Sequence, residues 1–78
     1  MKPIVTEKSI MSIEQQNILT FRTNMNLTKA QIQKEIEDFF EVKVEKVRTL
    51  IRKNKKYAYI KLKKDFPAID VATKLGLI

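Results

Sequence analysis

Cysteine and histidine are absent from the 78 residues, and glycine occurs only once. Without cysteine, the chain has no disulfide, no thiol nucleophile and no cysteine-ligated zinc. Because histidine is missing too, carboxylates are left as the only strong metal ligands. The chain also lacks a long apolar run, which excludes a membrane-spanning or secretory hydrophobic segment. What remains is a small folded domain, because 44% of the residues are hydrophobic and only two are proline.

Acidic residues are scarce relative to basic ones, nine against sixteen, and the formal net charge is +7. Residues 1–39 contain five charges of each sign, whereas residues 40–78 contain eleven cations and four anions. The segment from Arg52 to Lys64 has seven cations and no acid. Such a local patch is typical of proteins that bind a polyanion, and we predict that this patch binds a nucleic acid. The alternative explanation is a solvated lysine-rich strand edge that discourages aggregation.

The length predicts one domain over residues 1–78, because a chain this short cannot form two cores. Periodicity predicts an α+β fold in the order α-β-α-β-β-α. Helices are expected over about 6–14, 28–40 and 66–75, and strands over about 17–23, 42–52 and 57–64. We expect three to four strands to form a small open antiparallel sheet with the helices packed on one face.

Cap signals mark the ends of the first and last helices. Thr6 is the expected N-cap of the first helix, and Val5 is expected to pack on Ile10 as a hydrophobic staple. Asp65 is the expected cap of the last helix, and Gly76 is placed to end it.

The central helix has the clearest pattern. Thr28 and Gln31 form a capping box, and four apolar residues recur on one face, namely Ile32, Ile36, Phe39 and Phe40. The solvent side takes the three acids Glu35, Glu37 and Asp38. The inner face of the last helix is expected to carry Ile69, Ala72 and Leu75.

The strands divide their residues between two faces. In the segment 42–52 the apolar residues first stand at even positions, such as Val44, and then at odd positions, such as Val47. A regular strand keeps one face at alternate positions, so this change predicts a bulge near Glu45. The helix-covered face should carry Leu19, Phe21, Ala58, Ile60 and Leu62. The open face should carry Arg22, Tyr57, Tyr59, Lys61 and Lys63. Aromatic and basic side chains interleaved on an open sheet suit RNA, although ordinary cross-strand packing explains the tyrosines equally well.

No catalytic or cofactor motif is present. The sequence has no glycine-rich phosphate loop, no nucleophile with a base and no paired carboxylates in a plausible pocket. Glu35, Glu37 and Asp38 do not share one side of a helix, so we interpret them as a solvated face and predict no metal site. We therefore predict a protein that is not an enzyme and uses no cofactor.

Several motifs together resemble the universal large-subunit ribosomal protein twenty-three family. Pro3-Ile-Val-Thr-Glu-Lys-Ser9 is similar to its N-terminal motif, and Asn17-Ile-Leu-Thr-Phe21 to its first strand. The stretch from Thr28 to Val47, followed by Thr49, resembles its signature helix and second strand. Lys56-Tyr-Ala-Tyr-Ile-Lys-Leu62 is similar to its last strand. The resemblance covers essentially the whole chain.

The resemblance implies a structural protein of the large ribosomal subunit, in the cytoplasm, which binds large-subunit rRNA beside the polypeptide exit tunnel. It implies contacts with neighbouring ribosomal proteins there and no membrane insertion. It assigns RNA contacts to Thr6, Lys8, Ser9, Lys29, Lys34 and Thr49. Arg48 replaces the asparagine usual in the family, so its contact changes from an amide to a guanidinium. The charge pattern adds Arg52, Lys53, Lys55, Lys56, Lys61 and Lys63 to these candidates.

The resemblance further implies a docking surface for nascent-chain factors such as the signal recognition particle. Its expected residues are Glu7, Phe40, Glu41 and Val42. Only about four residues are expected to join the last two strands, whereas bacterial members have a long loop there, so the chain resembles the compact archaeal form.

Two other functions stay open at this point. The first is a free-standing RNA-binding or chaperone module that is not a stable part of the ribosome. The second is a small enzyme similar to acylphosphatases, which would need a phosphate-cradling loop that the sequence lacks. Residues such as Thr6, Lys29 and Lys34 also have a plain structural or solvated explanation.

Overall fold

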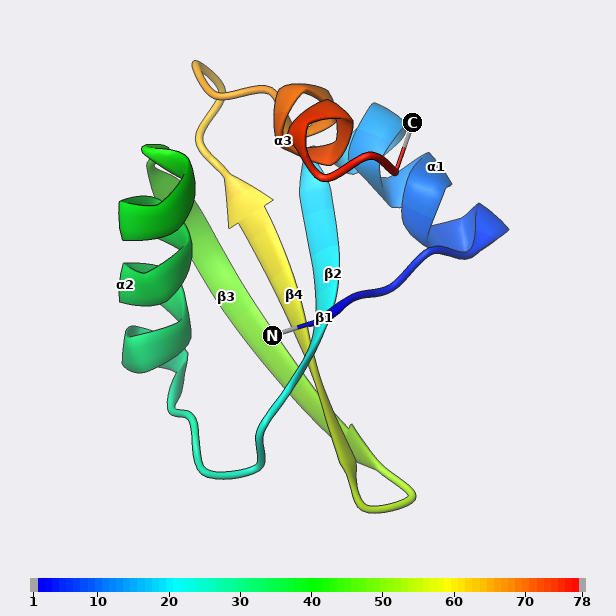
Figure 1. Cartoon of the computed structure of the whole chain (residues 1–78), viewed down its shortest axis with the longest axis vertical. Helices are drawn as coiled ribbons and strands as arrows, with labels where there is room; N and C mark the ends of the chain where they lie inside the picture. The colour runs from blue at the N-terminus through cyan, green and yellow to red at the C-terminus, as the bar shows by residue number, and fades with distance from the viewer. Residues whose placement is uncertain (1, 78) are drawn as a thin grey trace.

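The computed structural model describes residues 2–77. In chain order the elements are β1 (Lys2–Pro3), α1 (Glu7–Gln16), β2 (Ile18–Thr23), α2 (Lys29–Phe40), β3 (Val44–Arg52), β4 (Lys55–Leu62) and α3 (Ala68–Lys74). Figure 1 shows the three helices of these residues around one sheet. The predicted α+β fold is confirmed. Its order is also confirmed, with one addition, because the two-residue strand β1 precedes α1 and is too short to give a periodic signal.

The sheet is antiparallel and has the order β1-β2-β4-β3. The middle strand β4 pairs Tyr59 with Thr20 of β2 on one side and with Arg48 of β3 on the other. The register shifts between Val44 and Lys46, which confirms the bulge predicted near Glu45. The extra residue explains why both Val44 and Val47 are buried although their parity differs.

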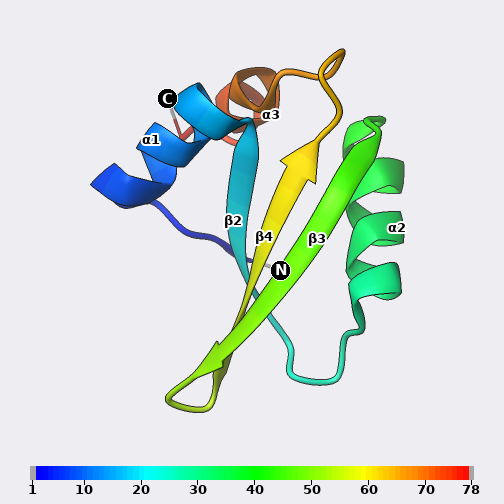
Figure 2. The same cartoon turned by 180° about the vertical axis from the view of Figure 1, so that it is seen from behind.

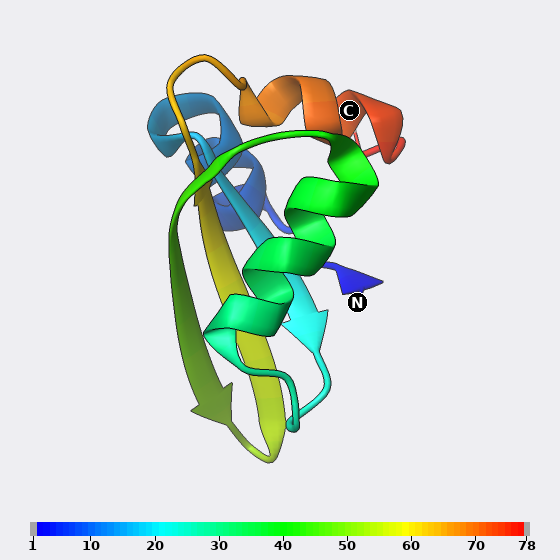
Figure 3. The same cartoon turned by 90° about the vertical axis from the view of Figure 1, so that its left-hand side faces the viewer.

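One face of the sheet is covered and forms the core. Figure 3 shows α2 lying in front of the strands, with α1 and α3 at one end of the sheet. The five strand residues predicted to face the helices are buried, namely Leu19, Phe21, Ala58, Ile60 and Leu62. They pack with Ile13 of α1, with Ile32 and Ile36 of α2, and with Val71 and Ala72 of α3. The face assignment made from strand alternation is therefore confirmed.

Helix α2 buries a slightly different stripe from the predicted one. Ile32, Ile36 and Phe40 turn toward the core, but Phe39 is 76% exposed and meets Phe40 edge-on, with ring centroids 4.8 Å apart. The reason is that Glu37, expected in solvent, is half-buried and its Oε2 accepts a 2.9 Å hydrogen bond from the Val44 backbone N–H. The helix is rotated toward Glu37, which moves Phe39 off the opposite edge of the buried stripe.

The first two helices begin with capping boxes. Thr6 and Ser9 exchange hydrogen bonds at the start of α1, as Thr28 and Gln31 do at the start of α2. Both threonine caps were predicted, but the staple at α1 was wrong, because Val5 is 53% exposed. A cap of this kind contributes about 1 kcal/mol to stability. At α1 that contribution comes from the reciprocal hydroxyl bonds.

The first turn of helix α3 is capped by a side chain that is distant in the sequence. The predicted cap Asp65 is wrong, because the helix starts after Pro67 and has no local side-chain cap. Instead, Asn17 Oδ1 accepts a hydrogen bond from the Ala68 N–H. Ile69, predicted to face inward, is 41% exposed. The predicted stop is confirmed, since Gly76 has φ +76° and closes the helix in a Schellman motif.

A two-residue turn joins β3 and β4, shorter than the four residues expected. Lys53 and Asn54 both have left-handed backbone angles, with φ of 52° and 62°. Positive φ at both central residues is the signature of a type I′ turn, whose twist matches that of a hairpin. Figure 1 shows this hairpin extending away from the helices α1 and α3. Within residues 2–77, none of the helices has the length and apolar character needed to cross a bilayer.

Candidate RNA-binding surface

The face of the sheet turned away from α2 is hollowed into a groove. Figure 2 shows this face, with α1 standing beside the strands. The groove has a volume of about 460 Å³. It is lined by Ile4, Thr6, Lys8, Ser9, Ser12, Gln16, Ile18, Thr20, Arg48, Leu50, Arg52, Tyr57 and Tyr59. We call this set of residues the outer groove, which brings together the N-terminal segment, α1 and three strands.

The floor of the outer groove is built by strand register. Tyr57 lies opposite Leu50, and Tyr59 lies opposite both Thr20 and Arg48. Both tyrosines are half-buried, so part of each side chain is open to the groove. They alternate with Ala58 and Ile60, which point into the core and hold the strand in place. The floor therefore presents aromatic and aliphatic surface on a rigid strand.

The wall of the outer groove comes from α1. Thr6 Oγ1 accepts a 3.1 Å hydrogen bond from the Ser9 N–H, and Ser9 Oγ donates to the carbonyls of Ile4 and Thr6 at 2.9 Å. These bonds fix the start of the helix against the strand segment that precedes it. Of the predicted RNA contacts, Thr6 and Ser9 thus have a clear structural role, whereas Lys8 is exposed at the rim.

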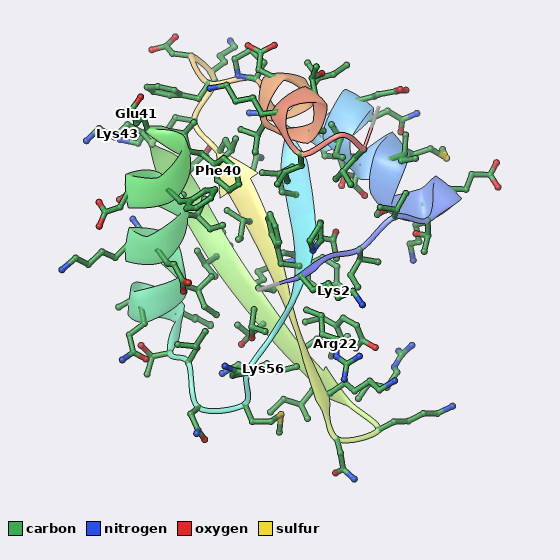
Figure 4. The ribbon with its side chains drawn as sticks, viewed as in Figure 1. Lys2, Arg22, Phe40, Glu41, Lys43 and Lys56 are labelled. Carbon is green, nitrogen blue, oxygen red and sulfur yellow. The ribbon has the colours of Figure 1, made fainter. Side chains whose placement is uncertain are left out.

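The charge of the outer groove is of one sign. Lys8, Arg48 and Arg52 line it, and none of its lining residues is acidic. Arg22 lies opposite Tyr57 and Lys61 lies opposite Ile18, so both extend the same basic face. Figure 4 shows Arg22 on the side of the sheet away from α2. Cations around an aromatic floor suit a phosphate backbone whose bases are exposed.

Other predicted RNA contacts lie elsewhere. Lys56 is on the helix-covered side, where its half-buried ammonium group donates a hydrogen bond to the Leu27 carbonyl (Figure 4). Thr49 lies opposite the buried Ala58 and shares that inner side. Lys53 and Lys55 are exposed at the hairpin tip, and Lys63 follows the end of β4. Lys29 and Lys34 are exposed on α2, outside the groove lining.

Six lining residues were not predicted, namely Ile4, Ser12, Gln16, Ile18, Thr20 and Leu50. Ile18 and Thr20 alternate with the core-facing Leu19 and Phe21, so strand alternation puts them on the same face as Arg22 and these two were accessible from the sequence. The contribution of α1 was not, because no sequence pattern tells that this helix stands beside the open face of the sheet.

A second hollow of about 180 Å³ lies between the end of α2 and the start of α3. It contains three of the residues expected for docking, Phe40, Glu41 and Val42. Asp65 and Asp70 add two more acids, and Phe66, Pro67, Val71 and Lys74 complete the lining. We call these nine residues the acidic hollow. Figure 4 shows Glu41 at the end of α2 and Phe40 turned toward the sheet.

The remaining docking residue, Glu7, is not part of the acidic hollow. It lies in the first turn of α1, where a carboxylate is favoured by the exposed N–H groups of the helix start. In residues 2–77 no group of three potential metal-ligating side chains comes together.

Comparison with known proteins gives a consistent result. The profile of the family described as Ribosomal protein L23 matches residues 1–70. Over 78 residues the chain is 41% identical to "Large ribosomal subunit protein uL23" of Saccharomyces cerevisiae strain S288c. The match covers 99% of this chain and 55% of the yeast protein. Over 75 residues it is 45% identical to the protein of the same name from Picrophilus torridus. This second match covers 96% of this chain and 92% of the Picrophilus protein. The chain spans about half the length of the yeast relative.

Proposed function

Because this chain belongs to the ribosomal protein L23 family, we propose that it binds large-subunit rRNA through the outer groove and the neighbouring hairpin. The family is structural and its members are not enzymes. Proteins of this family are components of the large ribosomal subunit, which is cytoplasmic. The observation that carries the proposal is the groove itself, which joins two tyrosines with three cations and no acid.

The position within the subunit is a finer part of the proposal. The family resemblance implies a site beside the polypeptide exit tunnel, with rRNA on one side and neighbouring ribosomal proteins around it. Two surfaces of opposite charge support such a position. The outer groove suits a polyanion, and the acidic hollow suits a basic protein segment.

Sedimentation tests the proposal against its rivals. We expect the tagged chain to migrate in a sucrose gradient with the large subunit, at one copy per particle and in moderate salt. A chain that stays at the top of the gradient, or leaves the subunit in moderate salt while still binding free RNA, would be a free-standing RNA-binding module. The enzyme alternative has lost its support, because the family is structural.

We also propose that the acidic hollow is a docking surface for nascent-chain factors such as the signal recognition particle, and that Glu7, at the start of α1 on the other side of the molecule, is a separate contact. Glu41 is exposed at the end of α2, beside the half-buried Phe40, and Asp65 and Asp70 lie in the same hollow. An acidic rim around a small apolar centre attracts a basic partner and speeds its association.

A charge-reversed variant tests this docking surface. Glu7→Lys combined with Glu41→Lys should assemble into large subunits normally, because neither acid lines the outer groove. The particles should bind the signal recognition particle about tenfold more weakly at low salt, mainly through slower association. The matched control is Glu14→Lys with Glu35→Lys, two exposed acids from the same helices. Equal factor binding by both sets of particles would remove the docking assignment and leave the RNA-binding role in place.

A further inference from the structure

We propose that the outer groove holds a single unstacked nucleobase of the RNA, rather than following the backbone of a paired helix. The inference rests on the proposed rRNA binding and adds the kind of RNA element that is bound. Its three parts are a floor for the face of the base, a wall for its edge, and a rim for the phosphates on either side.

The floor fits the face of a base. Tyr57 and Tyr59 are neighbours on the open side of β4, and both line the groove. A base inside a duplex has both faces covered by its neighbours, so it cannot stack on a tyrosine. A base in a bulge or loop has a free face, and RNA-binding proteins commonly stack such bases on aromatic side chains and arginine planes. Arg48, directly opposite Tyr59 in the sheet, supplies such a plane.

The wall fits the edge of a base. Ser12 and Gln16 of α1 line the groove one helical turn apart, and Thr20 lines it from β2. The Ser12 hydroxyl already donates a 3.1 Å hydrogen bond to the Lys8 carbonyl, so it offers its acceptor lone pairs. The Gln16 amide and the Thr20 hydroxyl can both donate and accept, as the Watson–Crick edge of an unpaired base requires. The groove volume of about 460 Å³ is within the range of sites that hold small ligands, roughly 300–1,000 Å³. This volume is enough for one inserted group.

The rim fits the phosphates that flank an inserted base. Lys8 comes from α1, whereas Arg48 and Arg52 come from β3, so the cations lie on different elements around the floor. An acidic protein segment would also be attracted by these cations. The aromatic floor favours RNA, because a nucleotide brings a flat π-face together with a negative charge.

A bulged RNA hairpin tests the inference. The probe is an RNA hairpin with one bulged 2-aminopurine, whose fluorescence falls when the base stacks. The control RNA is a hairpin of the same sequence without the bulge, in which every stem base is paired. We expect the protein to bind the bulged hairpin about tenfold or more tightly than the paired one, with quenching of the bulged base. Tyr59→Leu keeps apolar bulk but removes the ring, so it should weaken binding of the bulged hairpin about tenfold. Tyr59→Phe keeps the ring and should bind within about twofold of the parent.

The outcomes separate this inference from the proposed function. Equal affinity for the two hairpins, or an unquenched 2-aminopurine in the complex with the parent protein, would overturn base insertion. The rRNA-binding role would then still stand, provided that the chain sediments with the large subunit. Circular dichroism checks that Tyr59→Leu remains folded, and the quenching by the parent protein does not depend on any variant. Binding of an acidic peptide in place of either RNA would also overturn the inference.

Discussion

Replacing Asn17 by alanine should lower the free energy of unfolding by about 3–5 kcal/mol, out of the roughly 4–12 kcal/mol expected for a domain of this size. The Asn17 side chain accepts a hydrogen bond from the Ala68 N–H, and its two Nδ2 N–H groups are shared among the carbonyls of Leu62, Lys63 and Phe66, at 3.1, 3.3 and 3.2 Å. Each lost bond costs about 1 kcal/mol. Alanine at φ 58° adds about 1 kcal/mol of backbone strain.

Urea unfolding followed by circular dichroism measures this effect. Asn17→Gly removes the side chain without backbone strain, so it should lose about 1 kcal/mol less than Asn17→Ala. Asn54→Gly is the matched control, because Asn54 also has a left-handed backbone but lies in the exposed hairpin turn. That control should be neutral or slightly stabilising, since glycine is favoured there. If Asn17→Gly were as stable as the parent, the side-chain bonds would contribute nothing.

Replacing Lys8, Arg48 and Arg52 by glutamine should weaken RNA binding by about a hundredfold or more at 0.1 M salt. Each phosphate contact contributes a slope of about 0.7–0.9 in log K against log salt, so three lost contacts flatten the slope by about two to three units. Filter binding of an rRNA fragment over a range of salt concentrations measures both quantities. The three side chains are exposed, and we expect little change in stability.

The control removes the same charge from another part of the surface. Lys43, Lys64 and Lys74 are exposed and do not line the outer groove. Their joint replacement by glutamine should change the slope by less than about one unit. If both triple variants flattened the slope equally, net charge alone would drive binding and the outer groove would have no special part in it.

Local patterns predicted most of the fold. The caps Thr6 and Thr28, the bulge near Glu45 and the stop at Gly76 depend on residues within a few positions of one another, and all four are confirmed. Strand alternation also separated the inner from the outer face, because each side chain needs only its neighbours to choose a face. These features are encoded within single turns and strands.

Features that depend on distant segments were missed. Asn17 was predicted as the first residue of a strand, and its bonds to Leu62 and Ala68 leave no trace in the local sequence. Lys56 belongs to a run of cations, but its partner is the Leu27 carbonyl. Phe39 was misplaced because the rotation of α2 depends on the bond between Glu37 and Val44. A charge pattern therefore locates a basic surface, while the members of the groove require the fold.

The bonds of Asn17 also set an order of events during synthesis. Its hydrogen-bond partners lie 45 to 51 residues further along the chain, at the end of β4 and the start of α3. While the ribosome is still adding residues before 62, the side chain of Asn17 has none of these partners, and the core face of β2 lacks β4 beside it. Distant contacts of this kind also slow folding, because a long loop must close before they form. A nascent chain therefore exposes the apolar surface of β2 until residues 62–68 have been added, and products that stall before that point are expected to aggregate.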